Sequence, residues 1–93
     1  MTARDSRALA RVVIDLCRMR KLTVATAESC TGGLVAGALT DIAGSSAVVD
    51  RGYVTYSNAA KRALLGVPET TLATFGAVSR ETALAMAVGA LEN

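Results

Sequence analysis

The sequence predicts an α/β protein that contains a parallel β-α-β unit. Two short runs rich in β-branched residues flank one helical segment, and together they span roughly 35 residues, a suitable length for such a unit. Parallel strands need a crossover connection and cover on both faces of the sheet. Five helices are predicted beside these two strands, and the last would naturally lead into a third strand. We therefore expect an incomplete sheet, whose missing strands belong to a longer chain or another molecule.

The first helix is predicted to begin at Asp5 or Ser6, because either side chain can cap it. Its apolar residues recur at helical spacing and are expected to face the core: Ala8, Leu9, Val12, Val13, Leu16 and Cys17. Residues 22–27 then form a short, uncharged run with β-branched residues, which predicts the first strand.

A tight turn from Glu28 to Gly33 leads into the crossover helix. The apolar residues of that helix recur on one face before a stop at Gly44: Leu34, Val35, Ala38, Leu39 and Ile42. Gly37 inside this helix predicts close packing against another backbone, because glycine is otherwise costly there.

The second strand is predicted at residues 48–57, with a bulge at Gly52. Asn58 is expected to cap the next helix, Pro68 to open a short one as its first residue, and Ser79 to cap the last. The last helix is expected to bury its larger apolar residues: Leu84, Ala87, Val88 and Leu91.

Length and composition allow one small globular domain. The chain has 93 residues, of which 52% are hydrophobic and 19% charged, and this balance excludes intrinsic disorder. No apolar run reaches the roughly 18 residues that a membrane-spanning helix needs. The N-terminus is charged and lacks the apolar segment of a signal peptide, so a cytoplasmic protein is expected.

The net charge of +2 is unevenly distributed. Residues 1–21 carry six basic side chains against only Asp5 and Asp15. Arg11 and Arg18 lie four and three residues from Asp15, which favours ion pairs along a solvated helix face. The three aromatic residues do not alternate with basic ones, so nucleic acid is not an expected partner.

Two absences restrict the chemistry. Histidine is missing, and only Cys17 and Cys30 carry thiols. Because a structural zinc site takes about four Cys or His ligands, neither a metal site nor a disulfide framework is expected. Ser-His-Asp and Cys-His catalysis are excluded for lack of the imidazole base. Nucleophilic chemistry would therefore need a lysine or a tyrosine as proton acceptor.

Ligands of parallel β-α-β units gather at the carboxyl ends of the strands. Two polar segments are predicted there, the Glu28–Gly33 turn and residues 56–58 with Lys61. The turn offers backbone N–H groups at a helix start, two glycines and the hydroxyls of Ser29 and Thr31, which suits an anion or an oxyanion. The alternative is that these hydroxyls only cap the helix while the glycines relieve crowding.

Lys61 is the most informative residue of the second segment. With Asn58 as the cap, Lys61 falls in the first helical turn, where the helix dipole disfavours a cation. This favours the uncharged amine that a general base requires. The alternative is a surface lysine beside Arg62. Tyr56, at the end of the strand, either relays a proton or only packs.

Two serines are candidate nucleophiles. Ser29 is predicted at the same end of the sheet as Tyr56 and Lys61. Ser46 precedes the second strand, and a fully extended strand would place it roughly 30 Å from Tyr56. The geometry favours Ser29, and Ser46 stays open if the chain folds back or a second subunit supplies it.

Four motifs together resemble the C-terminal domain of the competence/damage-inducible protein CinA. They are Ala-Glu-Ser-Cys-Thr-Gly-Gly at 27–33, Asp-Ile-Ala-Gly-Ser-Ser at 41–46, Gly-Tyr-Val-Thr-Tyr-Ser-Asn at 52–58 with Lys61, and Gly-Ala-Val-Ser at 76–79. Their order and spacing match the family over nearly the whole chain. The resemblance implies a three-layer α/β/α fold and an enzyme that hydrolyses the carboxamide of nicotinamide mononucleotide, giving nicotinic acid mononucleotide and ammonia. It implies no metal or cofactor.

The expected site combines a serine nucleophile, either Ser29 or Ser46, with Lys61 as base and Tyr56 as relay. Its expected substrate contacts are Glu28, Thr31, Gly32, Gly33, Ser45 and Asn58. Domains of this family continue through a Gly-Ile-Ala-Gly-Pro strand and loop, so the sequence is expected to be the N-terminal part of one such domain.

The alternative function is a non-catalytic fragment or module that binds a nucleotide or a protein partner. The expected partners are a small nucleotide substrate and a second copy of the chain, since exposed strand edges favour self-association. Nucleic acid and membrane are not expected.

Overall fold

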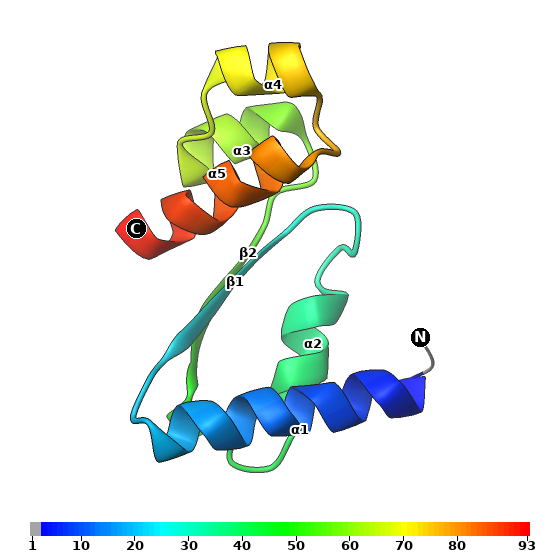
Figure 1. Cartoon of the computed structure of the whole chain (residues 1–93), viewed down its shortest axis with the longest axis vertical. Coiled ribbons are helices and arrows are strands. Elements are labelled where there is room, and N and C mark those ends of the chain that lie inside the picture. Colours follow the sequence, from blue (N-terminus) through cyan, green and yellow to red (C-terminus); the bar gives the residue numbers. More distant parts are fainter. Residues whose placement is uncertain (1–2) are drawn as a thin grey trace.

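The computed structural model describes residues 3–93, with side chains from residue 5 onward. Its elements are α1 (Ala3–Met19), β1 (Val24–Glu28), α2 (Leu34–Thr40), the short 3₁₀ helix η1 (Ser45–Ala47), β2 (Val49–Val54), α3 (Asn58–Leu65), α4 (Glu69–Phe75) and α5 (Arg80–Glu92). The two strands pair in parallel and form a two-stranded sheet (Figure 1). The predicted α/β class and parallel β-α-β unit are confirmed.

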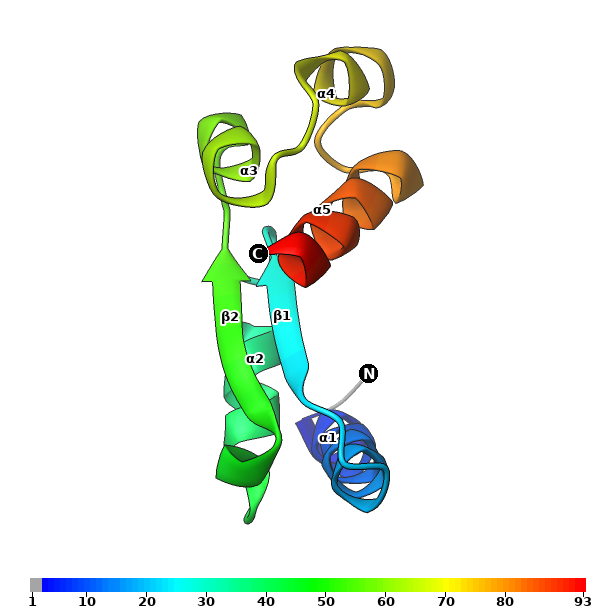
Figure 2. The ribbon, with the colours of Figure 1, turned by 90° about the vertical axis from the view of Figure 1, so that its left-hand side faces the viewer.

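The sheet lies between two helices (Figure 2). In that view α2 lies behind the strands and contacts both of them, whereas α5 packs against β1 on the opposite side. The helix α1 crosses near the amino ends of the strands, and α3 and α4 lie beyond their carboxyl ends (Figure 1). The arrangement is a three-layer α/β/α sandwich around a sheet of only two strands.

Side-chain alternation along the strands sorts residues between the two helices. Thr26 and Glu28 share one face of β1, and the Glu28 carboxylate bonds to α2. Ala27 faces the other way and, with its register partner Tyr53, packs against the core beneath α3, α4 and α5. This period of two is the ordinary geometry of a strand.

The predicted bulge at Gly52 is wrong. The register shifts between Val24, which pairs with Val49, and Ala25, which pairs with Arg51, so the additional residue is Asp50. The glycine has a different role, because a Cβ there would lie 2.6 Å from the Thr26 hydroxyl oxygen. Gly52 therefore leaves room for a neighbouring side chain.

Two small cores hold the layers together. One packs α1 on α2 and on the segment between α2 and β2 through Ala10, Ile14, Leu39, Ile42 and Val48. The other joins α3, α4 and α5 through Leu65, Val67, Leu72 and Met86. Each core lies near one end of the strands, which matches the elongated shape of the molecule in Figure 1.

The predicted buried faces of the two longest helices are wrong. The helix α1 buries the small stripe Ala10 and Ile14, with Cys17 half-buried, and exposes the wider apolar stripe Leu9, Val12, Val13 and Leu16. The helix α5 likewise buries Thr82, Met86 and Gly89 and exposes Leu84, Ala87, Val88 and Leu91. In both helices the contacting stripe consists of residues spaced by three or four positions that fit close to a neighbouring element.

The close approach predicted at Gly37 occurs at another glycine. A Cβ on Gly37 would meet no atom within 4 Å. A Cβ on Gly89 in α5 would lie 1.9 Å from the backbone carbonyl oxygen of Leu65 at the end of α3. Gly89 therefore permits the tight contact between α5 and α3.

Several helices and strands begin or end at other residues than the sequence predicts. The first helix begins at Ala3, so Asp5 lies within its first turn. The first strand is Val24–Glu28 and the second ends at Val54, because the chain leaves the sheet before its next helix. Pro68 is the cap of α4 and not its first residue, while the Ser79 cap is confirmed by a 3.1 Å bond from the Thr82 N–H to its hydroxyl.

The basic face of α1 does not form the predicted ion pairs. Among the described side chains, the ion pairs are Arg7–Asp41, Arg51–Asp50 and Arg62–Glu69. Arg18 donates instead to the backbone oxygen of Ala43. Within residues 3–93, no helix has the length and apolarity that crossing a membrane requires.

Candidate active site at the carboxyl ends of the strands

The last residue of β1, Glu28, is a buried carboxylate with four hydrogen-bond donors. Its Oε1 accepts from the Thr31 hydroxyl at 2.6 Å and from the N–H groups of Gly33 and Val35, each at 3.0 Å. Its Oε2 accepts from the Ala36 N–H at 3.0 Å. The carboxylate of Glu28, the last residue of β1, therefore caps the positive N-terminal end of α2.

The local sequence explains this geometry. Gly32 and Gly33 both adopt left-handed backbone angles, with φ of 58° and 106°, which glycine tolerates best. The chain can then fold back so that the first turn of α2 points its N–H groups at the residue before the turn. The two glycines therefore allow the Glu28 carboxylate to cap the start of α2.

Opposing effects set the pKa of Glu28. Burial alone raises it, but the Thr31 hydroxyl and the backbone N–H groups of Ala36, Val35 and Gly33 together bring the pKa below its ordinary value. The carboxylate is thus held as an anion without a basic side chain as partner.

This arrangement uses donors that the sequence assigned to substrate. The Gly33 N–H donates to Glu28, and the Gly32 N–H donates to the Ser29 carbonyl at 3.0 Å. Within the described residues, no hydrogen bond engages the N–H groups of Cys30 and Thr31 or the half-buried Ser29 hydroxyl. The turn therefore keeps its free polar groups around Ser29 and not at the glycines.

The second junction, between β2 and α3, buries a lysine. Lys61 is 1% exposed, and its Nζ donates to the backbone carbonyl of Tyr56 at 3.1 Å. The predicted alternative of a surface lysine is wrong. Buried lysines usually have a charged partner, and among the described residues this amine has none.

The residues around Lys61 differ in detail from the sequence prediction. The cap of α3 is Ser57, whose hydroxyl accepts from the Ala60 N–H at 3.0 Å, and not Asn58, which is an exposed first helical residue. Tyr56 is 75% exposed and contacts Lys61 through its carbonyl, not through its phenol.

Sequence reasoning missed Thr55. Its side chain is completely buried, and its hydroxyl makes no hydrogen bond within the described residues. Its backbone N–H donates to the carbonyl of Glu28 at 2.9 Å, which ties the two junctions together. The signal was available, because Thr55 directly precedes the polar run at the end of the predicted strand.

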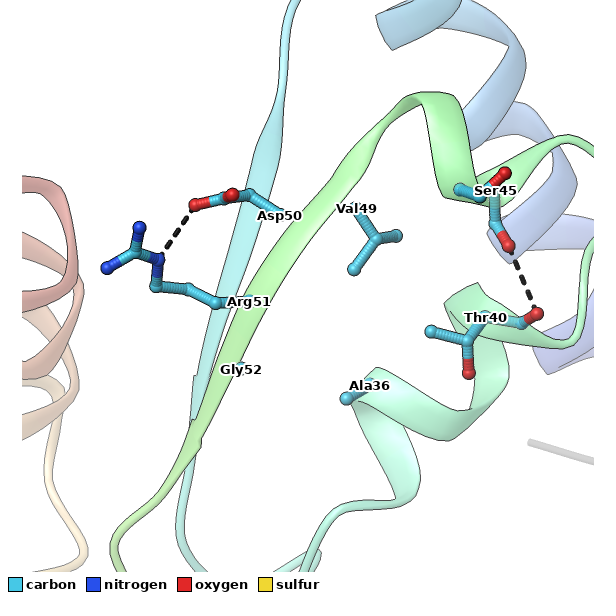
Figure 3. A pocket seen from close by; sticks show the side chains of 8 residues that line it. Ala36, Thr40, Ser45, Val49, Asp50, Arg51 and Gly52 are labelled. Carbon is cyan, nitrogen blue, oxygen red and sulfur yellow. Dashed lines mark hydrogen bonds and ion pairs between the residues drawn. The ribbon is translucent and has the colours of Figure 1, made fainter.

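The other serine candidates lie at the opposite end of the sheet. Ser45 and Ser46 are in η1, before β2, and line a cavity of about 490 Å³ between α2 and the outer side of β2 (Figure 3). The buried Ser45 hydroxyl bonds to the Thr40 carbonyl at 3.0 Å, and Ser46 is exposed. The structure therefore brings Ser29, Tyr56 and Lys61 to one end and leaves both of these serines at the other.

A larger hollow of about 950 Å³ runs between α1 and α2. Its lining is mostly apolar, and the ion pair between Arg7 and Asp41 borders it. Thr31 and Gly33 reach it from the turn, so the hollow opens beside the first junction.

Fold and site together define a class of protein: a three-layer α/β protein whose polar groups converge at the carboxyl ends of parallel strands. Comparison with known proteins identifies the family. Residues 6–93 match the CinA C-terminal domain, and the chain belongs to this family.

Named relatives agree with this membership. The chain is 53% identical over 92 residues to the nicotinamide-nucleotide amidohydrolase PncC of Escherichia coli, covering 99% of this chain and 56% of that protein. It is 62% identical over 78 residues to a CinA-like protein of Chloroherpeton thalassium, covering 84% of this chain and 19% of that protein.

A solved structure matches as well. The crystal structure of the competence/damage inducible protein CihA from Agrobacterium tumefaciens superposes with a TM-score of 0.90 at 67% identity, over 95% of this chain and 53% of that one. The chain thus spans about half the length of PncC and of CihA.

Proposed function

We propose that this chain carries the catalytic groups of a nicotinamide-nucleotide amidohydrolase, which converts nicotinamide mononucleotide to nicotinic acid mononucleotide and ammonia. The observation that carries the proposal is the buried amine of Lys61, at the same end of the sheet as the Ser29 turn, in a protein that has no histidine. The relative PncC bears the name of this activity.

In the proposed reaction the Ser29 hydroxyl attacks the carboxamide carbon, and Lys61 in its uncharged form accepts the hydroxyl proton. The C–N bond then breaks, and Lys61 returns the proton so that nitrogen leaves as ammonia. Water hydrolyses the resulting serine ester, which releases the carboxylate product and restores the hydroxyl. The exposed phenol of Tyr56 is free to contact the nucleotide or to relay the proton.

The free N–H groups of Cys30 and Thr31 are the proposed oxyanion donors. They directly follow Ser29 and have no partner within the described residues, whereas those of Gly32 and Gly33 are already used. Oxyanion donors contribute most when they are fixed before the reaction, as these backbone groups are. The start of α2 is therefore not available to the nucleotide phosphate, which needs another binding partner.

The decisive test is ammonia release from nicotinamide mononucleotide by the wild-type chain and by Lys61→Met, which keeps the volume of the side chain and removes its amine. We expect the variant to lose at least about 100-fold in kcat. Lys21→Gln, a change at the exposed lysine, is the matched control and should keep wild-type activity.

Escherichia coli PncC, assayed in parallel, verifies the assay. If PncC releases ammonia and the wild-type chain does not, the proposal fails for this chain. Binding of the nucleotide without turnover would favour the alternative of a binding module. Turnover that survives in Lys61→Met refutes the role of Lys61. A cytoplasmic location and a second copy of the chain as partner belong to the same proposal.

A further inference from the structure

The carboxylate of Glu28 has a place in the reaction beyond capping a helix. It is 5% exposed, and among the described residues its bonding partners are one hydroxyl and three backbone N–H groups, with no basic side chain. Glutamate is rarely buried to this extent unless paired. The burial is tolerated because backbone donors and the helix dipole replace a counter-ion.

The hydrogen bonds of the Glu28 carboxylate join the two ends of the segment that carries the candidate nucleophile, Ser29. Glu28 directly precedes Ser29, and its partners Thr31, Gly33 and Val35 follow within seven residues. The segment between is therefore closed into a loop by its own carboxylate. A helix of seven residues, such as α2, has little stability by itself, so the position of its start depends on this contact.

The same bonds decide which groups of the loop remain available. The donors at the start of α2 are consumed, and a buried negative charge lies against them, which repels a second anion. Within the part of the chain that the structure describes, the Ser29 hydroxyl and the N–H groups of Cys30 and Thr31 have no partners. The loop presents a hydroxyl and neutral donors, which suit a carboxamide better than a phosphate.

We propose that Glu28 is a positioning residue, whose carboxylate holds the Ser29–Gly33 loop in its reactive conformation and keeps the start of α2 closed to the phosphate of the substrate. This inference rests on the proposed function and replaces the expected contact between Glu28 and substrate.

The test compares Glu28→Gln with the matched control Glu81→Gln, which makes the same chemical change in the exposed first turn of α5. In Glu28→Gln one side-chain oxygen becomes an NH₂ group, so at least one donor loses its acceptor. We expect amide hydrogen exchange at Gly33, Val35 and Ala36 to accelerate about 10-fold or more, and no change at these amides in the control.

Steady-state kinetics separate positioning from substrate contact. Glu28→Gln should lower kcat by about 10- to 100-fold with KM changed less than about 2-fold, because a displaced nucleophile slows the chemistry without weakening binding. A rise in KM at constant kcat would overturn the inference and make Glu28 a substrate contact. Inorganic phosphate should leave exchange at the three amides of the wild type unchanged, and protection there would equally overturn it.

The two proposals fail separately. If the wild-type chain releases no ammonia, the proposed function falls, while the exchange experiment still decides whether Glu28 fixes the loop. If ammonia is released and exchange in Glu28→Gln matches that of the wild type, the proposed function stands and the positioning role is refuted.

Discussion

The two junctions at the carboxyl ends of the sheet differ in how their buried polar groups are paired. At the β1–α2 junction the carboxylate of Glu28 receives four hydrogen bonds. At the β2–α3 junction, among the described residues, the amine of Lys61 makes one hydrogen bond and the hydroxyl of Thr55 makes none. Native proteins pair nearly all their buried polar groups, so an unpaired group calls for an explanation. Among the described residues, the buried charge of the first junction is fully paired, whereas the buried amine and hydroxyl of the second leave most of their bonding capacity unused.

The helices after the two junctions are also held differently. The helix α2 is anchored at its first turn by a charge on the preceding strand. The helix α3 is held by α5 at its last residue, through the close contact between Gly89 and Leu65. This difference predicts which substitutions disturb each junction.

The largest effect on stability is expected from Gly89→Ala. A Cβ there would lie 1.9 Å from a backbone oxygen, which cannot move aside as a side chain would, so α3 and α5 must separate. We expect a loss of about 3 kcal/mol in the free energy of unfolding, measured by urea denaturation.

The control for this prediction is Gly37→Ala in α2, where a Cβ meets no atom within 4 Å. This change should stabilise the chain by up to about 1 kcal/mol, since alanine favours a helix over glycine. Equal losses at the two glycines would show that the close contact between α5 and α3 is not what distinguishes them.

A smaller and pH-dependent effect is expected at the first junction. The pKa of Glu28 is below its ordinary value of 4.5 in the folded protein, because bonds from Thr31, Ala36, Val35 and Gly33 outweigh its burial. A lowered pKa in the folded state means that ionised Glu28 contributes stability above the pKa of the unfolded chain. That contribution is lost as the pH falls through the folded value.

We therefore expect Glu28→Gln to cost about 2 kcal/mol at pH 7, with the gap to the wild type steady down to about pH 4.5 and narrowing below it. Urea unfolding of both proteins between pH 7 and 3 measures this gap, and the other carboxylates cancel in the difference. A gap at pH 3 as large as that at pH 7 would contradict the account.

The difference between the junctions could be predicted only in part from the sequence. Residue types and the βαβ pattern placed Ser29, Tyr56 and Lys61 at one end of the sheet and Ser46 at the other. The pattern also placed a lysine in a first helical turn, where its burial is informative. The turn residues around Glu28 indicated an anion site, but that the anion is the protein's own carboxylate depends on backbone angles at the glycines.

The helical spacing of apolar residues also predicts the fold only in part. It shows which residues of a helix share a face, but the neighbours decide which face is buried. In α1 the small stripe with Ala10 and Ile14 packs on α2, and the larger stripe with Val12 is exposed. In the same way, the close approach at Gly89 and not at Gly37 follows from how α5 crosses α3, which no local pattern encodes.

The smallest expected effects come from one substitution made at both junctions. Thr31→Val removes a bond to the Glu28 carboxylate and should cost about 1 kcal/mol. Thr55→Val removes a hydroxyl that has no partner, so it should change stability by less than about 0.5 kcal/mol or raise it. Both changes keep a β-branched side chain of similar size, and because Thr55 is buried and Thr31 is exposed, the apolar methyl group of valine favours Thr55→Val further. If Thr55→Val proves the costlier change in urea denaturation, its hydroxyl is engaged after all, and the β2–α3 junction is as fully paired as its neighbour.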